Sequence, residues 1–223
     1  MYDPDAAPST DPTFAAATRR RDLLLTLVML GIAFTPAWLL PTPLATPWLW
    51  VVSLVGAPAV FVSWMYAPWV PTPASDFDRI LACLDLQPGD AFCDLGAGDG
   101  RMLTRVHGAT GARCTGIEIS PALYLLARLR LAGSRAPLTQ MRFGDLHRAD
   151  LSQFDVLYVW GTAYWVGQPA FGAFVASALK PGARLVSYHY PVGGIPIQRC
   201  DNEGERPIFV YVFGGSGQDT SST

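Results

Sequence analysis

Two long apolar runs precede a series of shorter ones in this 223-residue chain. The stretch 23–75 contains no Asp, Glu, Lys or Arg, and a Pro-Thr-Pro break at 41–43 divides it into runs at 23–40 and 48–66. Each run approaches the length that a helix needs to cross a ~30 Å hydrocarbon core. The pattern therefore predicts a two-helix transmembrane hairpin over 23–70; a re-entrant hairpin or a buried soluble helix pair is the alternative.

From residue 71 onward the apolar runs are short and alternate with helical segments, which predicts an α/β fold with a parallel sheet. The polar segment 201–205 between the last two runs is too short to hold a crossover helix. These two runs must therefore form a hairpin, which adds one antiparallel strand to the sheet. The expected strands cover 91–93, 113–119, 139–143, 155–160, 184–189, 195–200 and 208–213.

A helix is also expected just before the first strand, from Ser75 to about Leu86. Ser75 and Asp78 have the spacing of a capping box, and apolar residues recur on one face of the segment behind them. This helix can cover a ligand from the strand-end side of the sheet. The linker 67–74 is rich in proline and should be semi-rigid.

A glycine-rich turn follows the first expected strand. Gly96, Gly98 and Gly100 let the chain bend tightly and let a ligand touch the backbone, while the helix that follows offers unpaired N–H groups. The dinucleotide pattern G-x-G-x-x-G would need glycine at position 101, where this chain has Arg101. The spacing therefore favours S-adenosylmethionine over a nicotinamide dinucleotide.

Acidic residues follow the next two strands. Glu118 can accept hydrogen bonds from both ribose hydroxyls of an adenine nucleoside, and Asp145 is placed to accept from the adenine amino group. The expected cofactor-binding residues are Asp94, Gly96, Ala97, Gly98, Asp99, Gly100, Glu118, Ile119, Gly144, Asp145, Leu146 and Trp160.

These motifs resemble those of class I S-adenosylmethionine-dependent methyltransferases, and the likeness runs from about Pro71 to Gly214. It rests on the segments 94–101, 116–121, 144–146 and 180–182. The resemblance implies a Rossmann-like seven-stranded sheet whose last strand is antiparallel, in a domain covering 71–215. It also implies S-adenosyl-L-methionine as the cofactor.

A narrower resemblance is to the FAM173 family of membrane-anchored protein-lysine methyltransferases. It rests on Pro71-Thr72-Pro73, on the acidic form of the turn at 98–101, and on 186–191. The family implies a lysine of a membrane protein as methyl acceptor. The family's Gly-Trp-x-Pro stretch is replaced here by Gly194-Ile195-Pro196.

Methyl transfer to lysine requires a neutral amine, whereas a free lysine side chain with a pKa of ~10.4 is mostly charged at neutral pH. Aromatic residues at the ends of the fourth and fifth strands could desolvate the amine, and a histidine there could accept its proton. Ordinary core packing is the alternative role for these aromatic residues. The expected catalytic residues are His189, Tyr188 and Trp160.

Composition and charge restrict the kinds of partner and ligand that we expect for this chain. The chain is 50% hydrophobic and 15% charged, with a formal net charge of −2 and no basic stripe, so we do not expect nucleic acid as a partner. Four cysteines without a C-x-x-C pair and three histidines without ligand-like spacing predict no metal. Tails at 1–22 and 216–223 are expected to be flexible and disordered, respectively.

Arg19-Arg20-Arg21 precedes the first apolar run, which by the positive-inside tendency places both ends of the hairpin in the cytoplasm. The expected location is thus a bacterial plasma (inner) membrane with the catalytic domain on its cytoplasmic side. A cleaved secretory signal fits less well, because no small-x-small cleavage site follows Phe34. A lipid or lipid-soluble small molecule is the alternative acceptor, and a non-catalytic cofactor-binding membrane module is the second alternative.

Overall fold

The computed structural model describes residues 46–47, 49–50, 54 and 70–214. Both expected tails and nearly all of the expected transmembrane hairpin at 23–70 lie outside these residues. Among the helices that are described, none is both long and apolar enough to cross a membrane.

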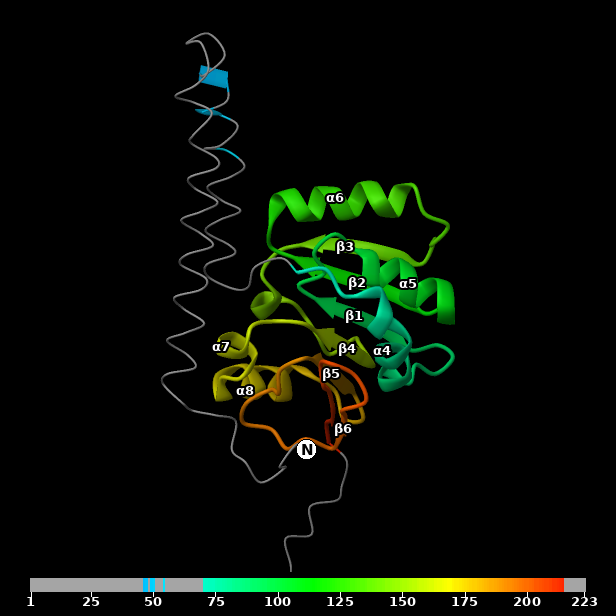
Figure 1. Ribbon diagram of the computed structural model, residues 1–223, viewed down its shortest axis with the longest axis vertical. Helices are drawn as coiled ribbons and strands as arrows, with labels where there is room; N and C mark the ends of the chain where they lie inside the picture. Colours follow the sequence, from blue (N-terminus) through cyan, green and yellow to red (C-terminus); the bar gives the residue numbers. More distant parts are fainter. Residues whose placement is uncertain (1–45, 48, 51–53, 55–69, 215–223) are drawn as a thin grey trace, which may run out of the picture.

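A seven-stranded sheet with the order β3-β2-β1-β4-β5-β7-β6 forms the centre of the domain (Figure 1). The first five strands are parallel, and β7 runs antiparallel to both β5 and β6. The prediction of a parallel sheet extended by a C-terminal hairpin is confirmed. The strands are β1 (Ala91–Leu95), β2 (Arg113–Glu118), β3 (Thr139–Phe143), β4 (Val156–Val159), β5 (Arg184–Tyr188), β6 (Arg199–Asp201) and β7 (Ile208–Val212).

The sixth strand is shorter than expected, since it begins at Arg199 rather than at residue 195. Pro196 cannot donate a hydrogen bond to a neighbouring strand, and Gly194 has a φ of +80°, outside the extended region. The segment before β6 therefore runs irregularly.

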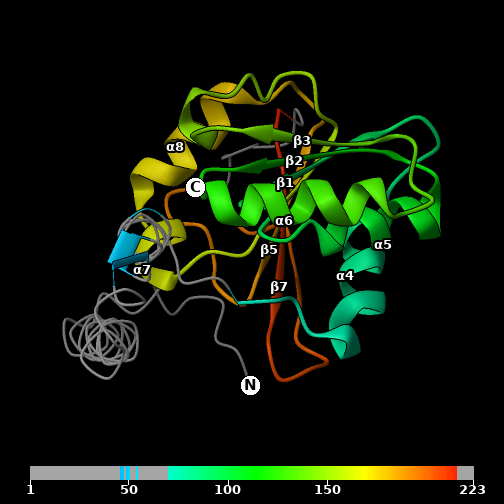
Figure 2. The same ribbon diagram turned by 90° about the horizontal axis from the view of Figure 1, so that it is seen from above.

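Helices cover both faces of the sheet (Figures 1 and 2). On one face α4, α5 and α6 contribute Ile80, Leu103 and Ala127 to a buried cluster; on the other, α8 contributes Phe171 and Val175 to a second cluster. The helices are α4 (Phe77–Leu84), α5 (Arg101–Thr110), α6 (Pro121–Ala132), α7 (Ala163–Val166) and α8 (Pro169–Ala178), with 3-10 turns η2 (Ala74–Asp76) and η3 (Leu146–Arg148).

The predicted capping box at the start of α4 is wrong. Ser75 lies in η2, Asp76 occupies the N-cap position, and no side chain caps the helix. The Asp76 carboxylate instead accepts a hydrogen bond from the hydroxyl of Tyr188, far along the chain. The helix also ends at Leu84, because Asp85 adopts a left-handed conformation with φ of +45°. A tertiary contact has replaced the local cap.

Gly116 in β2 lies where three side chains converge. A Cβ atom here would stand 2.6 Å from Met141 Sδ, 2.7 Å from Ala97 Cβ and 2.8 Å from Leu103 Cδ1. Because Ala97 belongs to the glycine turn, the missing side chain lets that turn lie directly against β2.

We expect Gly116→Ala to lower the free energy of unfolding by about 1–3 kcal/mol, because the added methyl overpacks a filled site. Gly108→Ala is the matched control: Gly108 lies in α5 with no atom within 4 Å of an added Cβ. That control should raise stability by roughly 0.5–1 kcal/mol. Urea titration followed by circular dichroism measures both, and equal stabilisation by the two substitutions would contradict the close contact at Gly116.

Candidate active site

A cavity opens at the carboxyl ends of β1 and β4, where ligands bind in open α/β sheets. Val70, Pro71 and Thr72 border it from the segment that leads into α4. Tyr158 on β4 and Met102 on α5 contribute to the wall, although the sequence pattern did not mark either of them. Six of the expected cofactor residues line it: Asp94, Gly96, Ala97, Gly98, Asp99 and Trp160.

The backbone of the glycine turn is tied to β2. The N–H groups of Gly96 and Ala97 both donate to the carbonyl of Ile117 at 3.0 Å. Gly96, Gly98 and Gly100 have φ values of +82°, +55° and +74°, which side chains rarely allow. The glycines therefore permit a sharp bend that keeps the backbone at the cavity wall.

The Glu118 side chain holds the glycine turn through hydrogen bonds to backbone N–H groups. One carboxylate oxygen accepts from Gly98 N at 2.8 Å, and the other accepts from Ser120 N at 2.7 Å. Burial raises the pKa of Glu118, while the backbone N–H donors partly oppose that rise. Each carboxylate oxygen can accept a second hydrogen bond, which leaves capacity for two ribose hydroxyls.

Asp94 lies at the end of β1 and is 3% exposed. Burial, followed by the nearby charges of Glu118 and Asp99, raises the pKa of Asp94 to about 8. Three acidic side chains thus share one small region, and ionising all of them there is costly. A cationic ligand would relieve this cost, and S-adenosylmethionine carries a positive sulfonium and a positive amino group.

Asp99 is neutralised within the protein. Its buried carboxylate pairs with Arg101 at 2.7 Å and with Arg130 of α6 at 2.5 Å. Burial alone would raise the pKa of Asp99, but hydrogen bonds from the two guanidinium groups hold it below its usual value. Asp99 thus borders the cavity and joins the turn to α6.

The remaining expected cofactor residues, Glu118 among them, are not part of the cavity lining. Gly144 donates its N–H to the Glu118 carbonyl at 3.0 Å, and the Asp145 side chain accepts from His147 N at 2.9 Å. The others are Gly100 at the start of α5, half-buried Ile119 next to Glu118, and buried Leu146 in η3.

Trp160 and Tyr188 form an aromatic pair at the strand ends, with ring centroids 4.8 Å apart and an interplanar angle of 89°. Trp160 lines the cavity, whereas Tyr188 is fully buried behind it. The Tyr188 hydroxyl donates to Asp76, so its hydrogen is already used. This geometry favours a supporting role for Tyr188, which holds the Trp160 ring in place.

His189 follows Tyr188 with a left-handed φ of +77°, and its N–H donates to the Pro207 carbonyl at 2.8 Å. The ring packs on Tyr190 with centroids 4.1 Å apart. Within the described part of the chain, its buried Nδ1 has no hydrogen-bond partner. Burial, and then the positive charge of Arg206, lower the pKa of His189, which favours the neutral ring. His189 is not among the residues that line the cavity.

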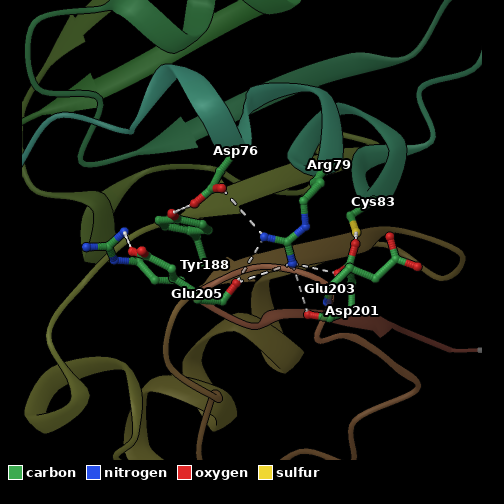
Figure 3. A network of polar contacts seen from close by, with 8 residues as sticks. Asp76, Arg79, Cys83, Tyr188, Asp201, Glu203 and Glu205 are labelled. Carbon is green, nitrogen blue, oxygen red and sulfur yellow. Dashed lines mark hydrogen bonds and ion pairs between the residues drawn. The ribbon is translucent and has the colours of Figure 1, made fainter.

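A polar network behind the aromatic pair joins α4 to the C-terminal hairpin (Figure 3). Arg79 pairs with Asp76 at 3.6 Å and with Asp201 at 2.6 Å, and also donates to the Arg206 carbonyl. Sequence analysis missed this network. Only the i,i+3 pair between Asp76, at the N-cap of α4, and Arg79 left a local signal, because the other partners lie more than a hundred residues away.

These features fit S-adenosylmethionine: a backbone turn, a carboxylate placed for ribose, and an excess of buried acid beside a cavity. Among the described residues, no group of His, Cys, Asp and Glu could hold a metal ion. The crystal structure of an RNA methyltransferase from Salinibacter ruber in complex with S-adenosyl-L-homocysteine matches with a TM-score of 0.61. It is 32% identical and covers 69% of this chain and 100% of that one. The chain belongs to the class I S-adenosylmethionine-dependent methyltransferases.

Within this class, residues 94–199 match the family described as the ANTKMT methyltransferase domain. The mouse adenine nucleotide translocase lysine N-methyltransferase is 28% identical over 163 residues, which cover 71% of this chain and 68% of that protein. A demethylmenaquinone methyltransferase from Tropheryma whipplei is 36% identical over 110 residues, or 48% of this chain and 46% of that protein. The family membership favours an enzyme over the non-catalytic module.

We expect the affinity for S-adenosylmethionine to fall as the pH is lowered, by up to about tenfold for each pH unit below the Asp94 pKa of about 8. The reason is that a cationic ligand favours ionised Asp94, so below this pKa binding must release a proton. Calorimetric titration over a pH series measures the dependence. Asp94→Asn should bind more weakly and lose most of this pH dependence. An equally steep dependence in Asp94→Asn would contradict the assignment to Asp94.

We expect Tyr188→Phe to reduce stability by about 1.5–3 kcal/mol, because it removes a hydrogen bond to a buried carboxylate. Methyl transfer should stay within a few-fold of wild type, since the ring against Trp160 is retained. Tyr211→Phe is a matched control, because it removes another buried hydroxyl, one that accepts from Val192 N. Thermal unfolding and a transfer assay separate the effects. If Tyr188→Phe abolished transfer while Tyr211→Phe did not, the Tyr188 hydroxyl would be catalytic after all.

Proposed function

We propose that this enzyme methylates a lysine amine of a membrane protein, from a domain held at the cytoplasmic face of the bacterial plasma membrane. The observation that carries the lysine assignment is His189, a neutral histidine with an unpaired buried Nδ1, in a chain that matches the ANTKMT methyltransferase domain. The match to the mouse lysine N-methyltransferase over 163 residues supports it.

Lysine methylation needs two things from the protein: a deprotonated amine and an in-line approach to the methyl carbon. S-adenosylmethionine supplies an activated methyl group. The rim formed by Trp160 and Tyr190 would exclude water from the amine and so favour its neutral form. His189 would accept the proton that the amine loses, after which the new nitrogen–carbon bond forms as the carbon–sulfur bond breaks.

Membrane attachment is supported by the sequence in front of the domain. The uncharged stretch 23–75 leads directly into the domain described from Val70 onward and includes its first residues, and three arginines precede the stretch. A short proline-rich linker would restrict the domain to targets at the same bilayer, which raises their effective concentration.

A lipid or lipid-soluble small molecule is the second candidate acceptor, and the 36% identity to the demethylmenaquinone methyltransferase favours it. Incubating cell membranes with the enzyme and radiolabelled S-adenosylmethionine distinguishes the two. Methyl-lysine in protein hydrolysates is the expected result. Label recovered solely in the organic phase would decide for the second candidate.

We expect His189→Ala to slow transfer by roughly 10²-fold or more, the usual range for loss of a general base, with cofactor affinity nearly unchanged. His107→Gln is the control, because His107 lies near the end of α5 and its Nδ1 contacts the Ala112 carbonyl. Single-turnover transfer and calorimetric binding measure the two quantities. A loss of cofactor affinity equal to the loss in rate would assign His189 to binding.

A further inference from the structure

The outward face of α6 is apolar although it lies on the surface. Leu125, Leu126 and Leu129 are 59%, 42% and 65% exposed, and Ala122 beside them is also exposed. Ala127 on the opposite side is fully buried against the domain. The helix therefore has apolar residues on both sides, whereas a surface helix usually has a polar outer face.

The apolar area continues onto the edge of the sheet. Helix α6 lies outside β3, the edge strand (Figure 1). Phe143 at the end of β3 is 57% exposed and contacts Tyr124 of α6, with ring centroids 5.4 Å apart. We call Leu125, Leu126, Leu129 and Phe143 the α6 surface. A contiguous exposed patch of this kind usually marks an interaction site.

The segment that carries the α6 surface is basic. The segment 121–143 contains Arg128, Arg130, Arg135 and Arg142 but no Asp or Glu, in a chain whose net charge is −2. Arg128 and Arg135 are exposed, whereas Arg130 is paired with Asp99. Apolar residues flanked by arginines complement the acyl chains and headgroups of an anionic bilayer. RNA would use the arginines but would leave the leucines exposed to water.

The position of the chain's entry into the domain agrees with a bilayer on this side. Val70 borders the cavity together with Gly98 and Asp99, and Arg130 of α6 donates to the Asp99 carbonyl at 2.8 Å. The entry point and α6 therefore flank the same glycine turn. This step rests on the proposed membrane attachment through the uncharged stretch 23–75.

We propose that the α6 surface docks onto the anionic surface of the membrane, with its leucines in the interface and Arg128 and Arg135 at the headgroups. Docking fixes the orientation of the domain as well as its distance from the bilayer. Because Arg130 and Asp99 connect α6 to the glycine turn, the cofactor cavity is held beside the membrane surface, where a membrane-protein lysine is presented.

The test uses the full chain in vesicles of equal phosphatidylglycerol and phosphatidylcholine. An environment-sensitive fluorophore is attached at Leu129→Cys, and in a separate protein at Ile197→Cys, with Cys200→Ser in both because the other three cysteines are buried. Ile197 is exposed just before β6, at the opposite edge of the sheet from β3. Nitroxide-labelled lipids should quench the Leu129 probe several-fold more than the Ile197 probe. Equal quenching would overturn the proposal.

Variants separate the contributions. The pair Arg128→Gln and Arg135→Gln should reduce quenching at Leu129, as should vesicles of phosphatidylcholine alone, whereas Arg199→Gln near Ile197 should not. Leu125→Ser with Leu126→Ser should lower lysine methylation in intact membranes while leaving cofactor affinity unchanged. Circular dichroism checks that these surface variants fold.

Other outcomes distinguish this proposal from the proposed function. Lysine methylation with an unquenched Leu129 probe would overturn the docking alone. Strong quenching at Leu129 with label only in lipid would keep the docking and overturn the lysine acceptor. If added RNA shielded the Leu129 probe, RNA would replace the bilayer as the partner of the α6 surface. If two copies of the chain crosslinked through α6 in the absence of vesicles, a second copy would replace the bilayer.

Discussion

The contact between the glycine turn and β2 is the constraint on which the rest of the site depends. It requires three features at once: backbone bonds from Gly96 and Ala97 to Ile117, a carboxylate at Glu118 that accepts from Gly98, and no side chain at Gly116. The consequence is electrostatic. Bringing the turn this close also buries Asp94 near Glu118, and the cost of burying acid is a raised pKa. The acidic region that this packing buries is therefore suited to a cationic cofactor.

The far wall of the cavity is fixed by a different kind of interaction. The ring of Trp160 packs against the ring of Tyr188. The Tyr188 hydroxyl donates a hydrogen bond to Asp76, and Asp76 forms an ion pair with Arg79. Arg79 also donates a hydrogen bond to the carbonyl of Arg206. The carbonyl of the next residue, Pro207, accepts a hydrogen bond from the backbone N–H of His189. The first helix of the domain and its last hairpin therefore jointly position Trp160 and His189.

Much of this could be predicted from the sequence, because the signals were local. The polar segment 201–205 is too short for a crossover, so the hairpin followed from chain length alone, and the spacing of the glycines gave the turn. What was missed depends on distant partners: Asp99 and Arg130 are 31 residues apart, and Asp76 and Tyr188 are 112 apart. The wrong capping box at Ser75 has the same cause, since a local pattern cannot show that a buried tyrosine will claim the neighbouring carboxylate.

The Asp99–Arg130 pair joins the two charged regions of the molecule. On the cavity side, Asp94 and Glu118 place buried acidic groups where a cationic cofactor lowers the cost of ionising them. On the outside, the arginines of α6 concentrate positive charge. Without an ion-pair partner, the buried Asp99 would add to the excess of acid in the cavity. Because Asp99 pairs with Arg130, the cavity is less acidic and α6 is anchored to the glycine turn. The same ion pair therefore limits the negative charge that the cofactor meets and sets the orientation of the surface that we propose meets the membrane.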